Sequence, residues 1–324
     1  PERITIIAPL VAYLFTFAAG TGHILYPLLP VIHDTALRNG IRPERPMTVS
    51  VVASLQGITA SPVSAAMAAF IVVVETQGYS LPKIMLIAVP ATLIGVIVAA
   101  LVMLRWGKEL EDDPEFQRRV AEEDILAEKN GARPGSPRIT AAVFLATVIL
   151  VVVFGAFPGL RPPGEDGEPM GIALLLQILM LSAAAIMVAV THVKVGPIAS
   201  SSIARTGVIA LVGIFGLAWL GLTVIAANEE LIVGGLEGLV TERPWTFAVA
   251  LFACSIVLFS QASTTRTLMP LGLSLGLGPA SLAAMWPAVN GAFFLPTYGT
   301  IVAAMNFDRT GTTGIGKFVF NHSF

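Results

Sequence analysis

The residues best suited to chemistry in this sequence are small polar residues and glycines that interrupt long apolar runs. Gly20-Thr21-Gly22-His23 interrupts one run, and Ser260-Gln261-Ala262-Ser263 interrupts another. Where a helix begins inside such a run, its first N–H groups lack acceptors within the helix, and its positive dipole end faces the break. Carboxylates bind at helix ends of this kind. The two breaks therefore predict a site for an anion.

Each of these two breaks is followed by a proline and then, further along the chain, by a second break, so the same pattern is present twice. The first precedes Pro30 and then Gln56-Gly57-Ile58-Thr59-Ala60-Ser61-Pro62. The second precedes Pro270 and then Asn290-Gly291-Ala292-Phe293-Phe294-Leu295-Pro296. Paired broken segments in two halves of a chain are typical of secondary transporters, whose substrate site lies between the repeats. We expect half-helices to begin after Thr21 and Gly22, after Ser61-Pro62, after Ser263 and Thr264, and after Leu295-Pro296.

Arg266 is the permanent charge that falls inside a predicted membrane segment. A charge at this depth costs about 2.5–3.5 kcal/mol even on the insertion scale, so it calls for a partner. A substrate carboxylate would be one partner. Alternatively, Arg266 pairs with backbone carbonyl groups or extends to the outer face. The acidic residues all fall in loops or at span ends, so no interior carboxylate is predicted to hold Na⁺ or relay protons.

The composition excludes several classes of protein. With 55% hydrophobic and 12% charged residues, the chain is too apolar for a soluble domain of its size. A net charge of -2 gives no case for a nucleic-acid partner. The single cysteine, Cys254, excludes disulfides and a zinc cluster, and the histidines have no metal-ligand spacing. We therefore predict no metal and no cofactor. Glycines and Lys317 match a phosphate-binding loop, but Phe318 replaces the required Ser or Thr.

Apolar runs of roughly 20 residues, long enough to cross a bilayer, predict an all-α polytopic membrane protein. The first repeat, residues 1–104, is expected to contain a hairpin over 4–36, a broken helix over 47–74 and a helix over 82–104. A cytoplasmic loop over 105–138 follows and includes a short surface helix.

The second repeat is expected over residues 139–324. Its predicted elements are scaffold helices over 139–157, 171–192 and 207–227, a hairpin over 245–277, a broken helix over 279–305 and the start of a last helix over 318–324. No scaffold helices precede the first hairpin. Symmetry therefore predicts that upstream scaffold helices, on the order of 80 residues, are missing from this sequence.

Basic residues orient these spans because cytoplasmic loops are enriched in them. If both hairpins are re-entrant and both broken helices cross, Lys83, Arg161 and Arg243 fall on one face, and Arg266 lies within a hairpin. The rest of the 19 basic residues then share the opposite, cytoplasmic face. The two hairpins would enter from opposite faces, so the repeats would be inverted.

Several long stretches resemble the anaerobic C4-dicarboxylate transporter family (DcuA/DcuB), among them GTGHILYPLLPVI, SQASTTRTLMPLGLSLG, MWPAVNGAFFLPTY and FDRTGTTGIGKFVFNHSF. The SQASTTR run is closer to the DcuA type. The resemblance implies uptake or exchange of fumarate, succinate, malate and aspartate across a bacterial inner membrane. It also implies an ion-transporter-superfamily-like fold with two re-entrant hairpins and two broken transmembrane helices.

Residues and resemblance together predict a carrier of C4-dicarboxylates that works by alternating access in the lipid bilayer, and not an enzyme. The alternatives are a carrier of another organic anion such as citrate or a monocarboxylate, and a membrane sensor that does not transport. An intramembrane enzyme would need a catalytic pair at the breaks. A homodimer is left open. The candidate substrate-binding residues are Thr21, Gly22, His23, Ser61, Pro62, Gln261, Ser263, Thr264, Thr265, Arg266, Asn290, Pro296 and Thr297.

Overall fold

The structure is a computed structural model that describes residues 3–75, 77–121, 137–164, 167–193, 243–296 and 298–324, with a few single residues between 193 and 243. Throughout these ranges the regular elements are helices, and the β contacts are isolated bridges such as that between Ile315 and His322. The prediction of a largely helical protein is therefore confirmed for the described residues.

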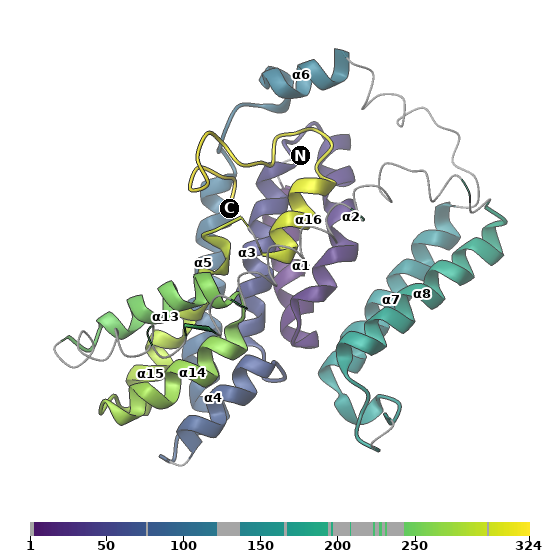
Figure 1. The fold of residues 1–324 in the computed structure, drawn as a ribbon. Coiled ribbons are helices and arrows are strands. Elements are labelled where there is room, and N and C mark those ends of the chain that lie inside the picture. Colours follow the sequence, from purple (N-terminus) through teal and green to yellow (C-terminus); the bar gives the residue numbers. More distant parts are fainter. Residues whose placement is uncertain are drawn as a thin grey trace.

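The first half consists of helices that are interrupted where the sequence predicted. Its elements are α1 (Arg3–Ala19), η1 (Gly22–Ile24), α2 (Leu25–Arg38), α3 (Glu44–Ala60), α4 (Ala65–Glu75) and α5 (Leu81–Met103). α1 and α2 contact each other on either side of the break at Gly20 and Thr21, and Figure 1 shows them side by side. α3 and α4 are the two parts of the expected broken helix.

The segment after α5 contains η2 (Leu110–Asp112) and α6 (Pro114–Ala121), the expected surface helix. α7 (Pro137–Ala156), η3 (Pro158–Leu160) and α8 (Ile172–Thr191) follow, and α7 and α8 lie side by side in Figure 1. The predicted scaffold helix over 207–227 lies outside the residues that the structure describes, apart from single positions.

The second half contains α13 (Thr246–Leu258), α14 (Gln261–Ser274), α15 (Pro279–Met285), η5 (Trp286–Phe293) and α16 (Gly299–Phe307). α13 and α14 contact each other as α1 and α2 do. The expected helix over 318–324 is wrong, because residues 314–324 form a turn in which the Asn321 backbone N–H donates to the Phe318 carbonyl at 2.9 Å.

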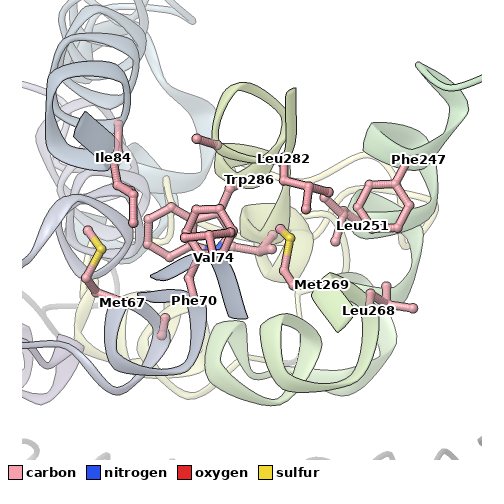
Figure 2. Packing of buried hydrophobic residues seen from close by; sticks show 14 of the residues in the cluster. Met67, Phe70, Val74, Ile84, Phe247, Leu251, Leu268, Met269, Leu282 and Trp286 are labelled. Carbon is pink, nitrogen blue, oxygen red and sulfur yellow. The ribbon is translucent and has the colours of Figure 1, made fainter. Parts of the chain in front are cut away.

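The two halves share one apolar core (Figure 2). Trp286 of η5 is fully buried and stacks on Phe70 of α4, with 4.7 Å between the ring centroids. Met67 and Val74 of α4 and Leu268 of α14 belong to the same cluster. α14 thus packs on the second part of the first broken helix, and in the same way α2 packs on α16. Each helix pair, α1 with α2 and α13 with α14, therefore contacts the broken helix of the other half.

By length and composition, two helical stretches in the described part of the chain could cross a membrane. They are Glu44–Glu75, which contains the break between α3 and α4, and Leu81–Met103. α5 exposes large apolar side chains, with Leu86 76% and Ile94 61% exposed. Exposed apolar surface on a helix whose backbone groups are bonded internally suits contact with lipid.

Three loops rich in charge meet at one end of the molecule. Arg42, before α3, forms an ion pair with Asp113, at 2.5 Å, and Arg45 pairs with Glu109 at 2.9 Å. Arg119 of α6 donates to the Arg309 carbonyl at 3.1 Å. Loops 38–45, 105–121 and 308–323, which the basic residues predicted to share a face, therefore contact one another.

Candidate functional site

The tips of the two helix pairs have the same backbone turn. Gly20 has φ +68° and Phe259 has φ +48°, both in the left-handed region. The next residues, Thr21 and Ser260, are extended, with φ −145° and φ −148°. The Thr21 hydroxyl oxygen accepts from the His23 N–H at 3.3 Å, and that of Ser260 accepts from the Ser263 N–H at 3.2 Å. The structure thus makes Thr21 and Ser260 equivalent helix caps.

The two tips enclose one cavity of about 260 Å³. Its wall also includes the first broken helix, through Ile58 and Ala66, and the start of α16, through Thr300. The residues that line it are Gly20, Thr21, Gly22, His23, Tyr26, Ile58, Ala65, Ala66, Phe259, Ser260, Gln261, Ala262, Tyr298 and Thr300. Residues more than 200 positions apart in sequence thus form one site.

Two helix beginnings face this cavity. Gly22 and His23 belong to η1, which continues into α2, and Gln261 and Ala262 are the first residues of α14. N–H groups in the first turn of a helix have no acceptor within the helix, and the dipole adds positive potential. The cavity therefore has the chemistry of an anion site, with donors from two helix beginnings.

Gln261 is held in place by a buried network beneath the cavity wall. Its Nε2 donates to the Leu55 carbonyl at 2.8 Å and to the Asn290 Oδ1. The Asn290 Nδ2 in turn donates to the Thr59 Oγ1 at 2.8 Å and to the Pro287 carbonyl at 3.0 Å. This network joins the α14 tip to both broken helices.

Two buried oxygen atoms in residues of the cavity wall have no hydrogen-bond partner within the described part of the chain. They are the Gln261 Oε1 and the Thr300 Oγ1, in side chains that are 7% and 2% exposed. A buried polar atom without a partner costs about 1–3 kcal/mol. Both atoms are closed to solvent, so a ligand in the cavity would reach them only if the wall rearranged.

The structure places the predicted site residues in three groups. Thr21, Gly22, His23 and Gln261 line the cavity. The others lie near the breaks without lining it: Ser61, Pro62, Ser263, Thr264, Thr265, Arg266, Asn290 and Pro296. Thr297 lies outside the described residues.

The hydroxyl groups expected at the α14 tip serve the helix itself. The Thr264 hydroxyl donates to the Ser260 carbonyl at 2.9 Å. The Thr265 hydroxyl donates to the Gln261 carbonyl at 2.7 Å and accepts from the Trp286 indole N–H at 3.0 Å. Their bonding capacity is thus largely used within the fold.

Arg266 does not line the cavity in this structure. It lies on the exposed face of α14, with Pro270 and Ser274, whereas Gln261 and Thr265 lie on buried faces. No ion pair or hydrogen bond joins Arg266 to another residue of the described ranges.

The half-helix start expected after Ser263 and Thr264 is wrong, because α14 begins before these residues. α4 begins at Ala65, after Ser61-Pro62, and the Ser64 hydroxyl oxygen accepts from the Met67 N–H at 3.0 Å. α14 begins at Gln261 with Ser260 as its cap, and α16 begins at Gly299. The start after Thr21 and Gly22 is confirmed.

Sequence reasoning missed Tyr26, Ser260, Tyr298 and Thr300 in the wall. Ser260 and Thr300 could have been found from their positions, because each lies within four residues of an expected break. Tyr26 gave no local signal, since it is one of several aromatic residues in an apolar run.

Comparison with known proteins shows the family of this chain. The profile of the family described as "Anaerobic c4-dicarboxylate membrane transporter" (DcuA_DcuB) matches residues 1–324. The chain belongs to this family. It is therefore a membrane protein of a transporter family, and the resemblance read from the sequence is confirmed.

Relatives in the DcuA/DcuB family are similar over the whole chain. It is 37% identical to the C4-dicarboxylate transporter DcuA of Escherichia coli strain K12 over 327 residues, which cover 100% of this chain and 76% of the relative. Identity to DcuA of Wolinella succinogenes is 36% over 328 residues, covering 100% and 75%. Identity to the anaerobic C4-dicarboxylate transporter DcuB of Escherichia coli O6:H1 is 35% over 337 residues, covering 100% and 75%. No solved structure matches the chain.

Proposed function

We propose that this protein carries C4-dicarboxylates such as fumarate, succinate, malate and aspartate across the bacterial inner membrane, by exchange through alternating access. The observation that carries the proposal is the cavity between the two helix tips, in a member of a C4-dicarboxylate transporter family. Its volume, about 260 Å³, is below the roughly 300–1,000 Å³ typical of pockets for drug-sized ligands. A small metabolite is therefore the fitting occupant.

The chemistry of the wall suits two carboxylates. One carboxylate would bind at the η1 end, near Gly22 and His23, and the other at the α14 end, near Gln261 and Ala262. Because both ends face one cavity, a four-carbon diacid would neutralise both at once. A monocarboxylate would leave one helix end without an anion and should bind more weakly.

The proposed architecture is a pair of inverted repeats, with α1 and α2 and then α13 and α14 as re-entrant hairpins that enter from opposite faces. The equivalent turns at Thr21 and Ser260 support it. So does the reciprocal packing of α2 on α16 and of α14 on α4. Rocking of one repeat against the other would expose the cavity to each side in turn.

We place the loops that contain Arg42, Asp113 and Arg309 in the cytoplasm, because they carry most of the basic residues and contact one another.

The domain division follows from the repeats: residues 1–104, the loop over 105–138 and residues 139–324. A lipid bilayer is the proposed surrounding, and a homodimer is compatible with it. The remaining predicted site residues other than Arg266 are proposed to act at or behind this cavity.

Counterflow in liposomes tests the function. Protein in liposomes loaded with unlabelled succinate should accumulate labelled succinate, and external fumarate, malate or aspartate should compete. Citrate and acetate are the controls, since they represent a carrier of another organic anion. Preferential counterflow of citrate would overturn the proposed substrate, and binding without counterflow would favour a sensor.

A further inference from the structure

The cavity between the two helix tips has a wall without permanent charges. Among the described residues that line it, none is Asp, Glu, Lys or Arg, and the titratable ones are His23, Tyr26 and Tyr298. A tyrosine ordinarily titrates at about pH 10 and an imidazole at about pH 6.5. His23 is therefore the residue of this wall whose charge changes around neutral pH.

The imidazole of His23 is accessible to a ligand. His23 is exposed, and its ring stacks on that of Tyr26, with 6.0 Å between the ring centroids and 17° between the planes. Both residues line the cavity. The His23 backbone N–H donates to the Thr21 hydroxyl oxygen, but within the described ranges no hydrogen bond joins the ring nitrogens to another residue. A ligand in the cavity can therefore bond to the ring directly.

The charged residues on the helices around His23 lie at the far ends of those helices. η1, which contains His23, contacts α1, α2 and α3. α1 carries Arg3 at its start, and α3 begins at Glu44. On α2, the first titratable residue after Tyr26 is His33, which lies about 15 Å further along the helix at 1.5 Å per residue.

The other titratable groups on the elements packed around the tips do not line the cavity. They are Tyr13 of α1, Asp34 and Arg38 of α2, Arg45 of α3, Arg138 and Arg161 at the two ends of α7, Cys254 of α13, Arg266 of α14 and Asp308 after α16. The Tyr13 hydroxyl group, for example, bonds to Thr92 of α5 at 2.8 Å. Within the described part of the chain, the charge of the wall therefore follows the charge of His23.

Diacids differ in the charge that this wall must balance. Fumarate, succinate and malate carry two negative charges when both carboxylates are ionised. Each helix beginning supplies about half a positive charge, so a neutral His23 leaves one negative charge unbalanced, and an imidazolium supplies the missing charge. Aspartate also carries an ammonium group, so its net charge is a single negative one. The helix ends balance it without His23.

We propose that His23 selects among diacids by their charge. With a protonated imidazole the cavity favours dianions such as fumarate and succinate, and with a neutral imidazole it favours 2-amino diacids such as aspartate. The protonated ring donates a charge-assisted hydrogen bond to a carboxylate, but it repels the ammonium group of aspartate. This rests on the proposed function, because the diacid must occupy this cavity.

Competition at several pH values tests the proposal in the wild type. Counterflow of labelled fumarate is measured in liposomes with the same pH on both sides, and unlabelled aspartate is the competitor. Neither ligand changes charge between about pH 5.5 and pH 7.5, since carboxyl groups titrate near pH 4 and the amino group above this range. The inhibition constant of aspartate, divided by the half-saturation constant of fumarate, should fall by about 5- to 20-fold from pH 5.5 to pH 7.5.

Two substitutions fix the charge of this position. His23→Asn is neutral and His23→Lys is positive over the whole range, so the ratio should lose its pH dependence in both. It should stay near the wild-type value at pH 7.5 in H23N and near the wild-type value at pH 5.5 in H23K.

His192→Asn is the matched control, because it removes a histidine outside the cavity wall. His192 is exposed at the end of α8, with φ 55°, a conformation that asparagine tolerates. H192N should keep the wild-type pH dependence.

A ratio that is constant with pH in the wild type would overturn the proposal, whether or not the variants reach the membrane. So would a failure of aspartate to compete at both ends of the pH range. Retention of the pH dependence in H23N, or its loss in H192N, would overturn the role of His23. If the wild type shows no counterflow of fumarate at any pH, the proposed function itself is wrong.

Discussion

Gly291 of η5 lies against the backbone of Phe252 in α13, so closely that a Cβ atom built on it would be 2.5 Å from the Phe252 carbonyl oxygen. Gly57 of α3 has the same relationship to α1, where a Cβ atom would be 2.8 Å from the Tyr13 carbonyl oxygen. Small residues allow membrane helices to approach closely. In each half, the broken helix therefore contacts the first helix of the pair, α1 or α13, through a glycine.

Alanine at either glycine should destabilise the protein. Gly57→Ala and Gly291→Ala force a Cβ atom against a backbone carbonyl, so we expect each to cost about 1–3 kcal/mol, as overpacked cores do. Gly95→Ala is the control, because a Cβ atom at Gly95 in α5 meets nothing within 4 Å. It should be neutral or stabilise the helix by up to about 1 kcal/mol. Unfolding in detergent measures all three, and equal stability of the three variants would contradict the close packing.

The helices and their breaks could be predicted from sequence because both leave local signals. Apolar runs set the length of each span, and the polar residues at Thr21 and Ser260 mark the breaks. The starts of α4 and α14 were less accurate, because several Ser and Thr residues in a row could each cap a helix. The choice of Ser64 and Ser260 depends on backbone geometry, which the order of residues does not fix.

The composition of the cavity wall was only partly predictable, since it depends on contacts over long distances. Tyr26 and Thr300 line the same cavity although they lie in different halves of the chain. Arg266 shows the opposite case. Its charge stood out in the sequence, but the rotation of α14 puts Gln261 at the cavity and Arg266 on the exposed face.

Cross-linking should report the closeness of the tips. Thr21→Cys and Ala262→Cys lie in the wall of one cavity of about 260 Å³. In a Cys254→Ala background, a short bifunctional maleimide should join them, and succinate should slow the reaction by occupying the cavity. Thr21→Cys with Gly95→Cys is the control pair, since Gly95 lies on α5 away from the wall. Mass spectrometry of the linked peptides detects the product. Failure to link the first pair, or equal linking of the control pair, would contradict this arrangement.

Arg266→Ala separates the two possible sites for the substrate anion. Because Arg266 is exposed and outside the cavity wall, we expect the half-saturation for succinate to change less than about twofold. If the guanidinium instead pairs with a carboxylate in another state of the transport cycle, the loss should be about 1.5–3 kcal/mol and larger for diacids than for monoacids. Arg266→Lys would then restore only part of the affinity, because an ammonium group lacks the bidentate geometry. Counterflow of succinate and of a monocarboxylate, at matched expression, distinguishes the outcomes.

Asp308 should stabilise the turn that follows α16. Burial alone would raise the pKa of its carboxyl group, but His33 beside it, the Thr310 hydroxyl and the Thr313 N–H more than offset this and hold the pKa at about 2. The His33 Nε2 lies 3.4 Å from the Asp308 Oδ1, and the Thr313 N–H donates to the Oδ2 at 2.6 Å. Asp308→Asn loses the charge that strengthens these bonds, so we expect a cost of about 1–3 kcal/mol at pH 7.

The pH dependence of this effect follows from the direction of the pKa shift. The pKa of Asp308 is lower in the folded state than its ordinary value of 3.8, so its contribution is complete above that value and is lost as the pH falls towards 2. The stability difference between the wild type and D308N should therefore persist from about pH 5 to pH 8, and it should be larger at the acidic end, where a protonated His33 pairs with the Asp308 carboxylate. Asp34→Asn is the control: Asp34 is 46% exposed in its pair with Arg309, and such pairs contribute about 0–1 kcal/mol. Thermal unfolding at several pH values measures both variants. A D308N difference that disappears between pH 5 and pH 7 would mean that protonation of His33, rather than the Asp308 carboxylate, determines the stability of this turn.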